Sequence, residues 1–299
     1  MKPLLCNILS RLFFVFSRRS AAVIGAAGLY ASSAWAADTL ERGKYLVEAL
    51  AACDNCHTPR SGQGYDVQAR FSGGSQSFTG AGYTTRGGNI TPDEASGIGE
   101  WSDAELKAAI TAGRGRNGPL APFMPSESYA ALTTADLEAV TLFLRSMPPV
   151  TTPPSVAPDR RAEERRPPLP GAEGPFREDA LVDRKMRGLY VASLARCMGC
   201  HSADVNDAPD HLNGLGAGGK IFRTPAGVAV ASNITSHPEK GVGGWSADDL
   251  KRAITEGVSR DGRRLAPTMA NLSKAHFSKM SAEDLDALIL WLRTVPPKE

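Results

Sequence analysis

The sequence predicts an all-α protein built from two tandem copies of one helical module. Three observations lead to this prediction. Most of the chain repeats itself once, at an offset of 144 to 148 residues. Helix-capping signals and apolar residues at helical spacing recur in both copies. Neither copy shows the alternation of strand-like and helix-like segments that would favour a parallel sheet between helices.

The internal repeat is visible in blocks of sequence that keep their order and spacing. ALAACDNCH at residues 49–57 corresponds to SLARCMGCH at 193–201, at an offset of 144. LTTADLEAVTLFLRSMPP at 132–149 corresponds to MSAEDLDALILWLRTVPP at 280–297, at an offset of 148. Small insertions therefore separate two copies of a module of roughly 110–120 residues, a usual size for a small domain.

The first 36 residues have the features of an export signal. Four basic residues and no acidic one accompany an apolar stretch at residues 21–31, and Ala34-Trp35-Ala36 fits a cleavage site. This stretch is short for a membrane span, so we expect cleavage, with an uncleaved anchor as the alternative. Residues 37–299 contain 30 Lys and Arg against 32 Asp and Glu, a balance that gives no reason to expect nucleic-acid binding.

A proline-rich, charged segment separates the two copies. It reads TTPPSVAPDRRAEERRPPLPGAEGPFR and has no apolar periodicity, as expected for an extended connector. The predicted organisation is therefore a signal peptide over 1–36, a first module over 37–150, a Pro-rich linker over 151–177 and a second module over 178–299.

Each copy contains the signals of an early and a middle helix. The early helix precedes the cysteines, and its apolar residues on one face are Leu40, Tyr45, Leu46, Ala49 and Leu50. Ser102 and Glu105 form a capping box that opens the middle helix, which runs to Gly113. Ser246 and Asp249 open its counterpart in the second copy.

The last helix of each copy is predicted to begin at Thr133 or Thr134 and at Ser281. In the second copy the apolar residues at i, i+3, i+4 and i+7 are Leu285, Leu288, Ile289 and Leu292. Residues 60–98 and 202–242 are rich in Gly, Ser, Thr, Asn and Pro, and we expect them to be mostly loop.

Both copies contain the motif C-x-x-C-H, which several kinds of site share. A thioredoxin-like redox site would need a strand-then-helix setting that the sequence does not show. A structural zinc site needs four ligands, and each copy alone is one or two short. A disulfide between cysteines so close together would close a very small loop. None of these interpretations accounts for the histidine that follows the second cysteine.

Covalent haem attachment accounts for every defined position of the motif. Two thiols can add to the two vinyl groups of a porphyrin, and the next histidine can bind the iron as the proximal ligand. The expected attachment residues are Cys53, Cys56, Cys197 and Cys200, and the expected proximal ligands are His57 and His201. Every other cysteine of the chain lies in the predicted signal. The motif pair therefore predicts two covalently bound haem c groups.

Three blocks carry a family resemblance: C-x-x-C-H, then NITPDEASGIGEWSDAEL, then LAPFMPSESYAALTTADLEAVTLFLRSMPPV, each with a counterpart in the second copy. On these blocks each copy resembles a class I cytochrome c domain. The chain resembles dihaem cytochromes c related to the cytochrome subunits of bacterial alcohol and aldehyde dehydrogenases. The resemblance covers residues 38–150 and 180–297. It implies an early helix crossed by the last helix, with a methionine loop that closes over the iron.

Met124 and Met269 are the expected sixth ligands. They are the methionines outside the signal that align between the copies, 67 and 68 residues after the proximal histidines. A methionine in this position suits an electron carrier, whereas an open position permits peroxide chemistry. The second copy departs from the family pattern, because Ala270 replaces the proline that follows Met124. The alternative ligands in that copy are His211, His237 and His276.

Two further pairs recur at equal distances from the cysteine motifs. Asn89-Ile90-Thr91 and Asn233-Ile234-Thr235 match glycosylation acceptors, but their repetition predicts a structural turn near each haem. Trp101 and Trp245 also recur, and we expect them to pack near the haem edge or to donate a hydrogen bond from the indole N–H.

These features predict an exported dihaem electron carrier without catalytic residues, rather than an enzyme. The expected electron donor is a periplasmic or membrane dehydrogenase, and the expected acceptor is another cytochrome or a terminal oxidase. The export signal predicts a location in the periplasm, with membrane association that is peripheral at most. A dihaem peroxidase with one open haem site is the alternative, and two matching methionine segments weigh against it. Whether the protein is a free carrier or a fixed subunit stays open.

Overall fold

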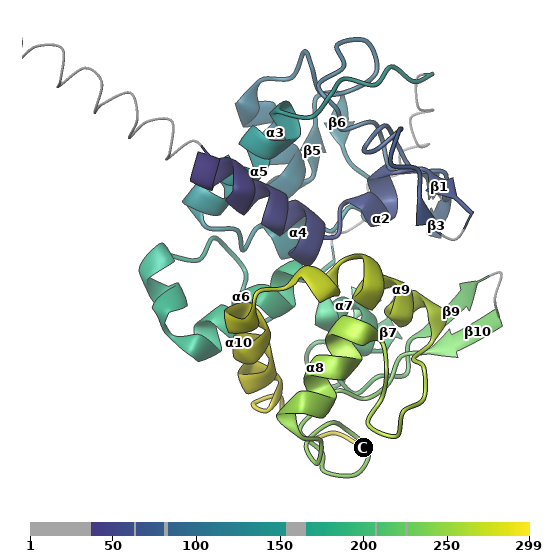
Figure 1. Ribbon diagram of the computed structural model, residues 1–299, viewed down its shortest axis with the longest axis vertical. Helices are drawn as coiled ribbons and strands as arrows, with labels where there is room; N and C mark the ends of the chain where they lie inside the picture. The colour runs from purple at the N-terminus through teal and green to yellow at the C-terminus, as the bar shows by residue number, and fades with distance from the viewer. Residues whose placement is uncertain (1–36, 63, 81–82, 154–165, 207, 225–226) are drawn as a thin grey trace, which may run out of the picture. The chain divides into compact units, whose positions relative to one another are not determined.

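The first and last helices of each repeat are the framework of the fold, shown in Figure 1. The structure is a computed structural model that describes residues 37–62, 64–80, 83–153, 166–206, 208–224 and 227–299. The predicted signal peptide and residues 154–165 of the predicted linker lie outside the described residues. We call residues 39–150 the first repeat and residues 178–299 the second repeat.

The first repeat begins with an α-helical segment at residues 39–45, which continues directly into η1. Its further elements, in chain order, are η1 (Leu46–Leu50), α2 (Asp54–His57), β1 (Arg60–Ser61), β2 (Gly64–Tyr65), β3 (Phe78–Gly80), β4 (Tyr83–Thr85), α3 (Asp103–Ala112), β5 (Arg114–Gly115), β6 (Gly118–Pro119), α4 (Ser126–Tyr129) and α5 (Thr134–Arg145).

The second repeat follows the same order of helices. Its elements are η2 (Glu178–Val182), α6 (Arg184–Leu194), α7 (Cys197–His201), β7 (Asp204–Val205), β8 (Ala208–Pro209), β9 (Ile221–Thr224), β10 (Gly227–Val230), α8 (Ala247–Glu256), α9 (Pro267–Ala275), η3 (Phe277–Lys279) and α10 (Ala282–Leu292). Among the described residues, no helix is long and apolar enough to cross a bilayer.

The predicted capping boxes are confirmed in both repeats. The Ser102 hydroxyl accepts a hydrogen bond from the Glu105 backbone N–H, and the Glu105 carboxylate accepts one from the Ser102 N–H. Ser246 and Asp249 form the same reciprocal pair at the start of α8. Such caps satisfy backbone donors that a helix start leaves unpaired. Both helices then end at a glycine in the left-handed region, as the sequence predicts for Gly113.

The last helices also begin where the sequence predicts. The side chains of Thr133 and Ser281 accept hydrogen bonds from backbone N–H groups at the starts of α5 and α10. The periodic residues of α10 are all buried, namely Leu285, Leu288, Ile289 and Leu292. Burying these side chains, at about 1.5–3 kcal/mol each, stabilises the helix more than its intrinsic propensity does.

Glycines allow the first and last helices of each repeat to cross in direct backbone contact. A Cβ atom on Gly43 would lie 2.0 Å from the Ala139 carbonyl oxygen in α5. A Cβ atom on Gly188 would lie 2.1 Å from the Ala287 carbonyl oxygen in α10. No side chain fits at such distances, so these two positions require glycine. Each repeat thus contains the helix crossing that the family resemblance implies, and α6 lies beside α10 in Figure 1.

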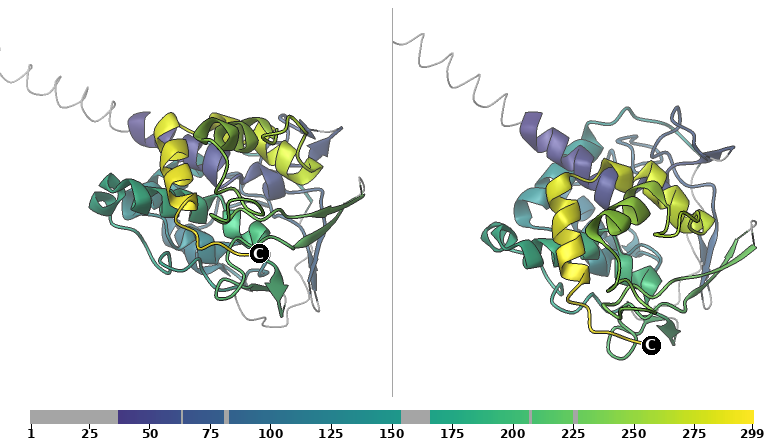
Figure 2. Two further views of the ribbon diagram at one scale, coloured as in Figure 1. Left: turned by 90° about the horizontal axis from the view of Figure 1, so that it is seen from below. Right: turned by 60° about the horizontal axis from the view of Figure 1, so that its bottom comes forward.

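The segments between the helices are mostly loop, as the sequence predicts. Within residues 60–98 and 202–242 each repeat also contains two short antiparallel hairpins, β1–β2 with β3–β4 and β7–β8 with β9–β10. The longest pairs Ile221 with Val230 and Thr224 with Gly227, because β-branched and aromatic residues there favour extended backbone. This hairpin projects away from the helices in Figures 1 and 2. The regular structure is mainly helical, with few strands.

Two buried carboxylates join the repeats reciprocally. Asp136 in α5 accepts hydrogen bonds from Arg42 of its own repeat, at 2.8 and 2.7 Å, and from the Tyr190 hydroxyl of the second repeat. Asp284 in α10 accepts a hydrogen bond from Arg187 of its own repeat, at 2.6 Å, and from the Tyr45 hydroxyl of the first repeat. We call these contacts the reciprocal Asp contacts. Residues 39–299 form one compact unit.

A buried histidine adds a second junction between the repeats. His276 is 1% exposed, and its Nδ1 lies 2.7 Å from the Glu48 carbonyl oxygen. Its Nε2 lies 2.7 Å from the Tyr65 hydroxyl. The carbonyl can only accept, so Nδ1 carries the proton and Nε2 accepts from Tyr65. Burial lowers the pKa of His276, against the opposing effect of the Glu48 carbonyl, which favours this neutral form.

The reciprocal Asp contacts should contribute measurably to stability. Tyr190→Phe removes a buried hydrogen bond to a carboxylate and should lower the free energy of unfolding of the protein by roughly 1.5–3 kcal/mol. Urea unfolding measures the change. The control is Asp179→Asn, which breaks the fully exposed ion pair with Arg177 and should have no measurable effect. Equal effects of the two substitutions would contradict the assignment.

The junction at His276 should make stability depend on pH. An unfolded histidine titrates near 6.5, whereas the folded pKa of His276 is lower. Below about pH 6.5 the unfolded state therefore binds a proton that the folded state does not, and stability falls as pH falls, by at most about 1.4 kcal/mol per pH unit. His276→Gln should reduce this slope between pH 7 and 5 in urea unfolding. An unchanged slope would show that other groups cause it.

Candidate functional site

Both C-x-x-C-H motifs lie on short helices that begin in the same unusual way. The motif residues form α2 and α7, and the residue before the first cysteine has a positive φ in each repeat, 50° at Ala52 and 57° at Arg196. A non-glycine residue in this region stores roughly 1–3 kcal/mol of strain, and such residues cluster at functional sites. The strained residue turns the chain from the preceding helix into the motif, so both motifs are presented in the same local geometry.

The two predicted proximal histidines are oriented identically. Nδ1 of His57 lies 2.8 Å from the Gly88 carbonyl oxygen, and Nδ1 of His201 lies 2.7 Å from the Ser232 carbonyl oxygen. A carbonyl accepts only, so Nδ1–H donates and Nε2 remains as the ligand atom, the arrangement usual for metal-binding histidines. Burial lowers the pKa of both histidines, which favours the neutral form that a metal requires.

The thiols of the motifs do not have the properties of a redox pair. Burial raises the pKa of Cys53 and of Cys197 to about 12, and it also raises the pKa of Cys56. Catalytic and redox C-x-x-C cysteines instead have lowered pKa values. The four motif cysteines, all within the described residues, form no disulfide. No group of three or more His, Cys, Asp or Glu side chains placed to hold a metal ion occurs in the described part of the chain.

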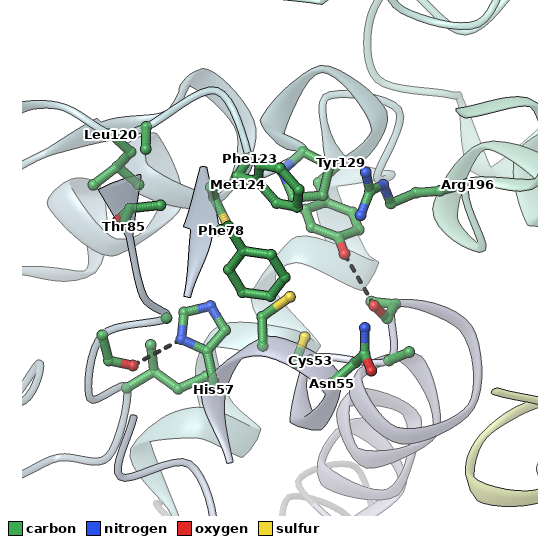
Figure 3. Close-up of a pocket in the computed structure, with 18 of the residues that line it drawn as sticks. Cys53, Asn55, His57, Phe78, Thr85, Leu120, Phe123, Met124, Tyr129 and Arg196 are labelled. Atoms are coloured by element: carbon green, nitrogen blue, oxygen red, sulfur yellow. Dashed lines mark hydrogen bonds between the residues drawn. The ribbon is translucent and has the colours of Figure 1, made fainter. Parts of the chain in front are cut away.

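One large cavity brings the predicted residues of the first repeat together. Its volume is about 2040 Å³, whereas small-molecule sites usually enclose about 300–1,000 Å³. Cys53, Cys56, His57 and Met124 all line it. In Figure 3 Cys53 and His57 lie on one side of the cavity and Met124 on the other, with Phe78 between them. The donor set and the size of the cavity therefore fit a haem.

Met124 owes its position to the proline that follows it. Proline disfavours the α conformation in the residue before it, so α4 cannot begin until Ser126. Met124 consequently lies in a bend before the helix, and its side chain points into the cavity (Figure 3). This is the methionine segment that the family resemblance implies.

The second repeat differs at this point and corrects an expectation. Met269 was expected on a loop, but it lies in the first turn of α9, which begins at Pro267. Ala270 imposes no break, and Pro267 suits the first helical position, so the helix starts before the methionine. Among the described residues of this helix, Met269 does not line the large cavity; those that do are Pro267, Thr268, Asn271 and Leu272. Of the four site residues predicted in this repeat, Cys200 lines the cavity. Cys197, His201 and Met269 are not among the described residues that line it.

The three rival histidines of the second repeat have other partners. His276 lies at the junction described above. Nδ1 of His237 accepts hydrogen bonds from two backbone N–H groups of the following turn. His211 donates from Nδ1 to the Pro168 carbonyl oxygen, at 3.0 Å. None of the three is among the described residues that line the cavity, and the same holds for Met269. The cavity lining therefore does not choose between these four residues, and Met269 stays the predicted sixth ligand.

The recurring Asn-Ile-Thr segments form the predicted turns. In the first repeat the Asn89 side-chain oxygen accepts hydrogen bonds from the Thr91 N–H and hydroxyl, at 2.9 and 2.7 Å. Asn233 and Thr235 make the same two contacts, at 2.9 and 2.6 Å. In each repeat the Asn amide also donates to a backbone carbonyl beyond the last helix. These turns fasten the end of each repeat beside its histidine.

The recurring tryptophans are held by equivalent arginines. Arg145 in α5 donates hydrogen bonds to the backbone carbonyls of Ile98 and Trp101. Arg293 donates to the backbone carbonyls of Gly243 and Trp245, so the tryptophan carbonyl is the acceptor that both repeats share. Trp101 also lines the cavity, in agreement with a position near the haem.

Sequence reasoning missed residues that line the cavity. Phe78 and Phe123 stack with their ring centroids 4.4 Å apart, and Tyr129 and Arg196 lie beside them (Figure 3). Arg196 was signalled by a difference between two otherwise matching blocks, because it stands where the first repeat has Ala52. The aromatic residues lie in segments without clear periodicity and gave no such signal.

Comparison with known proteins places these features in a family. No family model matches the chain. The chain is 30% identical over 283 residues to the gluconate 2-dehydrogenase cytochrome c subunit of Pantoea cypripedii, covering 87% of this chain and 60% of the relative. It is 28% identical over 284 residues to the fructose dehydrogenase cytochrome subunit of Gluconobacter japonicus, covering 87% and 53%. It is 31% identical over 119 residues to a diheme c-type cytochrome of Cereibacter sphaeroides, covering 40% and 38%.

The chain is related to the cytochrome c subunits of bacterial dehydrogenases and to a dihaem cytochrome c. Its two C-x-x-C-H motifs agree with this relationship, and two covalently bound haem c groups are its cofactors. The cytochrome spans about half to three-fifths of the length of the first two relatives.

Each of the two methionines of this cytochrome should affect one haem. If Met124 binds the first haem iron, Met124→Ala should remove one Met-to-iron near-infrared band of the ferric protein and lower one reduction potential. Met269→Ala should do the same to the second haem. The control is Met186→Ala, because Met186 has no aligned methionine and is 37% exposed, so both bands should persist. An unchanged spectrum in Met269→Ala would overturn the assignment of that ligand.

Proposed function

We propose that this cytochrome is an exported dihaem electron carrier. The observation that supports it most is that Met124 lines the same cavity as Cys53, Cys56 and His57. His57 and Met124 would both bind the iron of a haem held here, which would leave it no position for a substrate. A methionine ligand also favours a high reduction potential, which suits electron transfer.

The residues proposed to hold the two haems have separate tasks. Cys53, Cys56, Cys197 and Cys200 would bind the porphyrins covalently, and His57 with Met124 and His201 with Met269 would bind the irons. When bound, each haem supplies a one-electron couple between ferrous and ferric iron. The carbonyls of Gly88 and Ser232 fix the histidine tautomers. No side chain needs to act as acid, base or nucleophile.

We propose the same organisation that the repeats predict. A signal peptide over 1–36 would precede two class I cytochrome c domains, over 37–150 and 178–299, joined by a Pro-rich linker over 151–177. The equivalent capping boxes, histidine contacts and arginine contacts of the two repeats support two copies of one domain. Matches of 111 and 119 residues to further relatives, about one repeat in length, agree with it. Export would place the protein in the periplasm, at most peripherally attached to a membrane.

A dehydrogenase is the proposed electron donor, in the periplasm or the membrane. Two relatives are cytochrome subunits of gluconate and fructose dehydrogenases by name, which supports a partner of this class. The proposed acceptor is another cytochrome or a terminal oxidase, because two haems with closed coordination can only pass electrons on. The alternative of a dihaem peroxidase has no support among the relatives named above, all of which are cytochromes.

Haem attachment is the first step to test. The mature chain should carry the mass of two haems and should stain for haem after denaturing electrophoresis, because thioether bonds survive denaturation. Cys53→Ser and Cys197→Ser should each retain one haem, and the spectra of the two variants should differ because their remaining methionine segments differ. A mature chain with free thiols or bound zinc would refute the proposed function.

A further inference from the structure

Arg196 occupies the space between the two haem-attachment motifs. It precedes Cys197 directly, and its strained backbone, with φ at 57°, directs the side chain away from its own helix. The guanidinium group points toward Tyr129 of the first repeat in Figure 3. Tyr129 is itself fixed, because its hydroxyl donates to the Ala51 carbonyl oxygen at 3.0 Å. A residue of the second repeat thus reaches the cavity of the first.

The large cavity is shared by both motifs at this point. Cys56 of the first motif and Cys200 of the second both line it, together with Arg196. Electrostatic interactions couple the guanidinium to both of these thiols and to the Tyr129 hydroxyl. One positive charge therefore lies beside the proposed attachment points of two haems.

Within the part of the chain that the structure describes, Arg196 forms no salt bridge. Several cations around the cavity do have carboxylate partners: Arg116 pairs with Glu100 and Lys220 pairs with Asp204. Among the ion pairs formed by the described residues, none involves Arg196; the carboxylate that acts on it electrostatically is that of Glu127. A charge acts more strongly on its neighbours at the edge of a protein interior than it does in bulk water.

The repeats are not symmetric in this charge. The equivalent residue of the first repeat is Ala52, which has nearly the same backbone conformation, with φ at 50°. The strained turn is therefore independent of the arginine side chain, because alanine adopts it too. What Arg196 adds to the turn is a cation that the first repeat does not supply.

We propose that Arg196 sets the reduction potentials of both haems, because its single positive charge disfavours the ferric state at the two sites together. This inference rests on the proposed haem attachment. Oxidation adds one positive charge to each iron, and a fixed cation nearby opposes that addition. Arg196 thus raises both reduction potentials together. Electron exchange with external partners shifts, whereas the difference in potential between the two haems is largely preserved.

The experiment compares midpoint potentials of the full-length, haem-loaded protein by spectroelectrochemical titration. Arg196→Gln removes the charge and should shift the redox equilibrium of both haems toward the ferric form by about tenfold, which is 59 mV for a one-electron couple. Arg196→Lys keeps the charge and should retain both potentials. The matched control is Arg177→Gln, since the Arg177 side chain is 82% exposed, and it should shift neither.

The outcomes separate charge from structure. Unchanged potentials in Arg196→Gln, or a shift of one haem alone, would overturn the inference, and so would a loss in Arg196→Lys as large as that in Arg196→Gln. Should Arg196→Gln fail to fold, Ala52→Arg adds a cation at the equivalent position and should raise both potentials; no rise would refute the idea. A wild-type chain without two haems would instead refute the proposed function itself.

Discussion

The reciprocal Asp contacts are the constraint on which the arrangement of both sites depends. A buried carboxylate is tolerated only when it is paired and hydrogen-bonded, and Asp136 and Asp284 each take one donor from their own repeat and one from the other. The same side chains that satisfy the charge therefore fix one repeat against the other. Tyr45 and Tyr190 stand seven or eight residues before the first motif cysteine. Fixing these tyrosines brings the two motifs to one cavity.

Local signals made much of the fold predictable. Each capping side chain binds the backbone N–H three residues further on, so a short stretch of sequence contains both partners of the hydrogen bond. The four capping residues are Ser102, Ser246, Thr133 and Ser281. Helical periodicity in the last helices works in the same way over two turns. The C-x-x-C-H motif is also complete within five residues. The orientation of each histidine, by contrast, needs a carbonyl 31 residues further on, and only the structure identifies it.

Contacts between the repeats could not be predicted. Tyr45 and Asp284 are 239 residues apart. The residues around a tyrosine do not specify which distant acceptor its hydroxyl will bind. The burial of His276 has the same cause, since both of its partners belong to the other repeat. The helical placement of Met269 could have been predicted from the sequence, because Ala270 allows a helix to continue, whereas a proline after the methionine disfavours one. Family likeness favoured a loop, and the local backbone chemistry favoured the helix that the structure contains.

The two repeats share their structural contacts and differ in residues beside the proposed haem sites. The caps, the histidine contacts and the helix crossings recur almost unchanged. The differences fall on the residues around the proposed irons: proline or alanine after the methionine, and alanine or arginine before the first cysteine. Because the cavity joins the two motifs, the Arg196 charge acts on both sites, whereas each methionine segment acts on its own. We therefore expect the methionine segments to cause any difference in reduction potential between the two haems, and Arg196 to change both potentials alike.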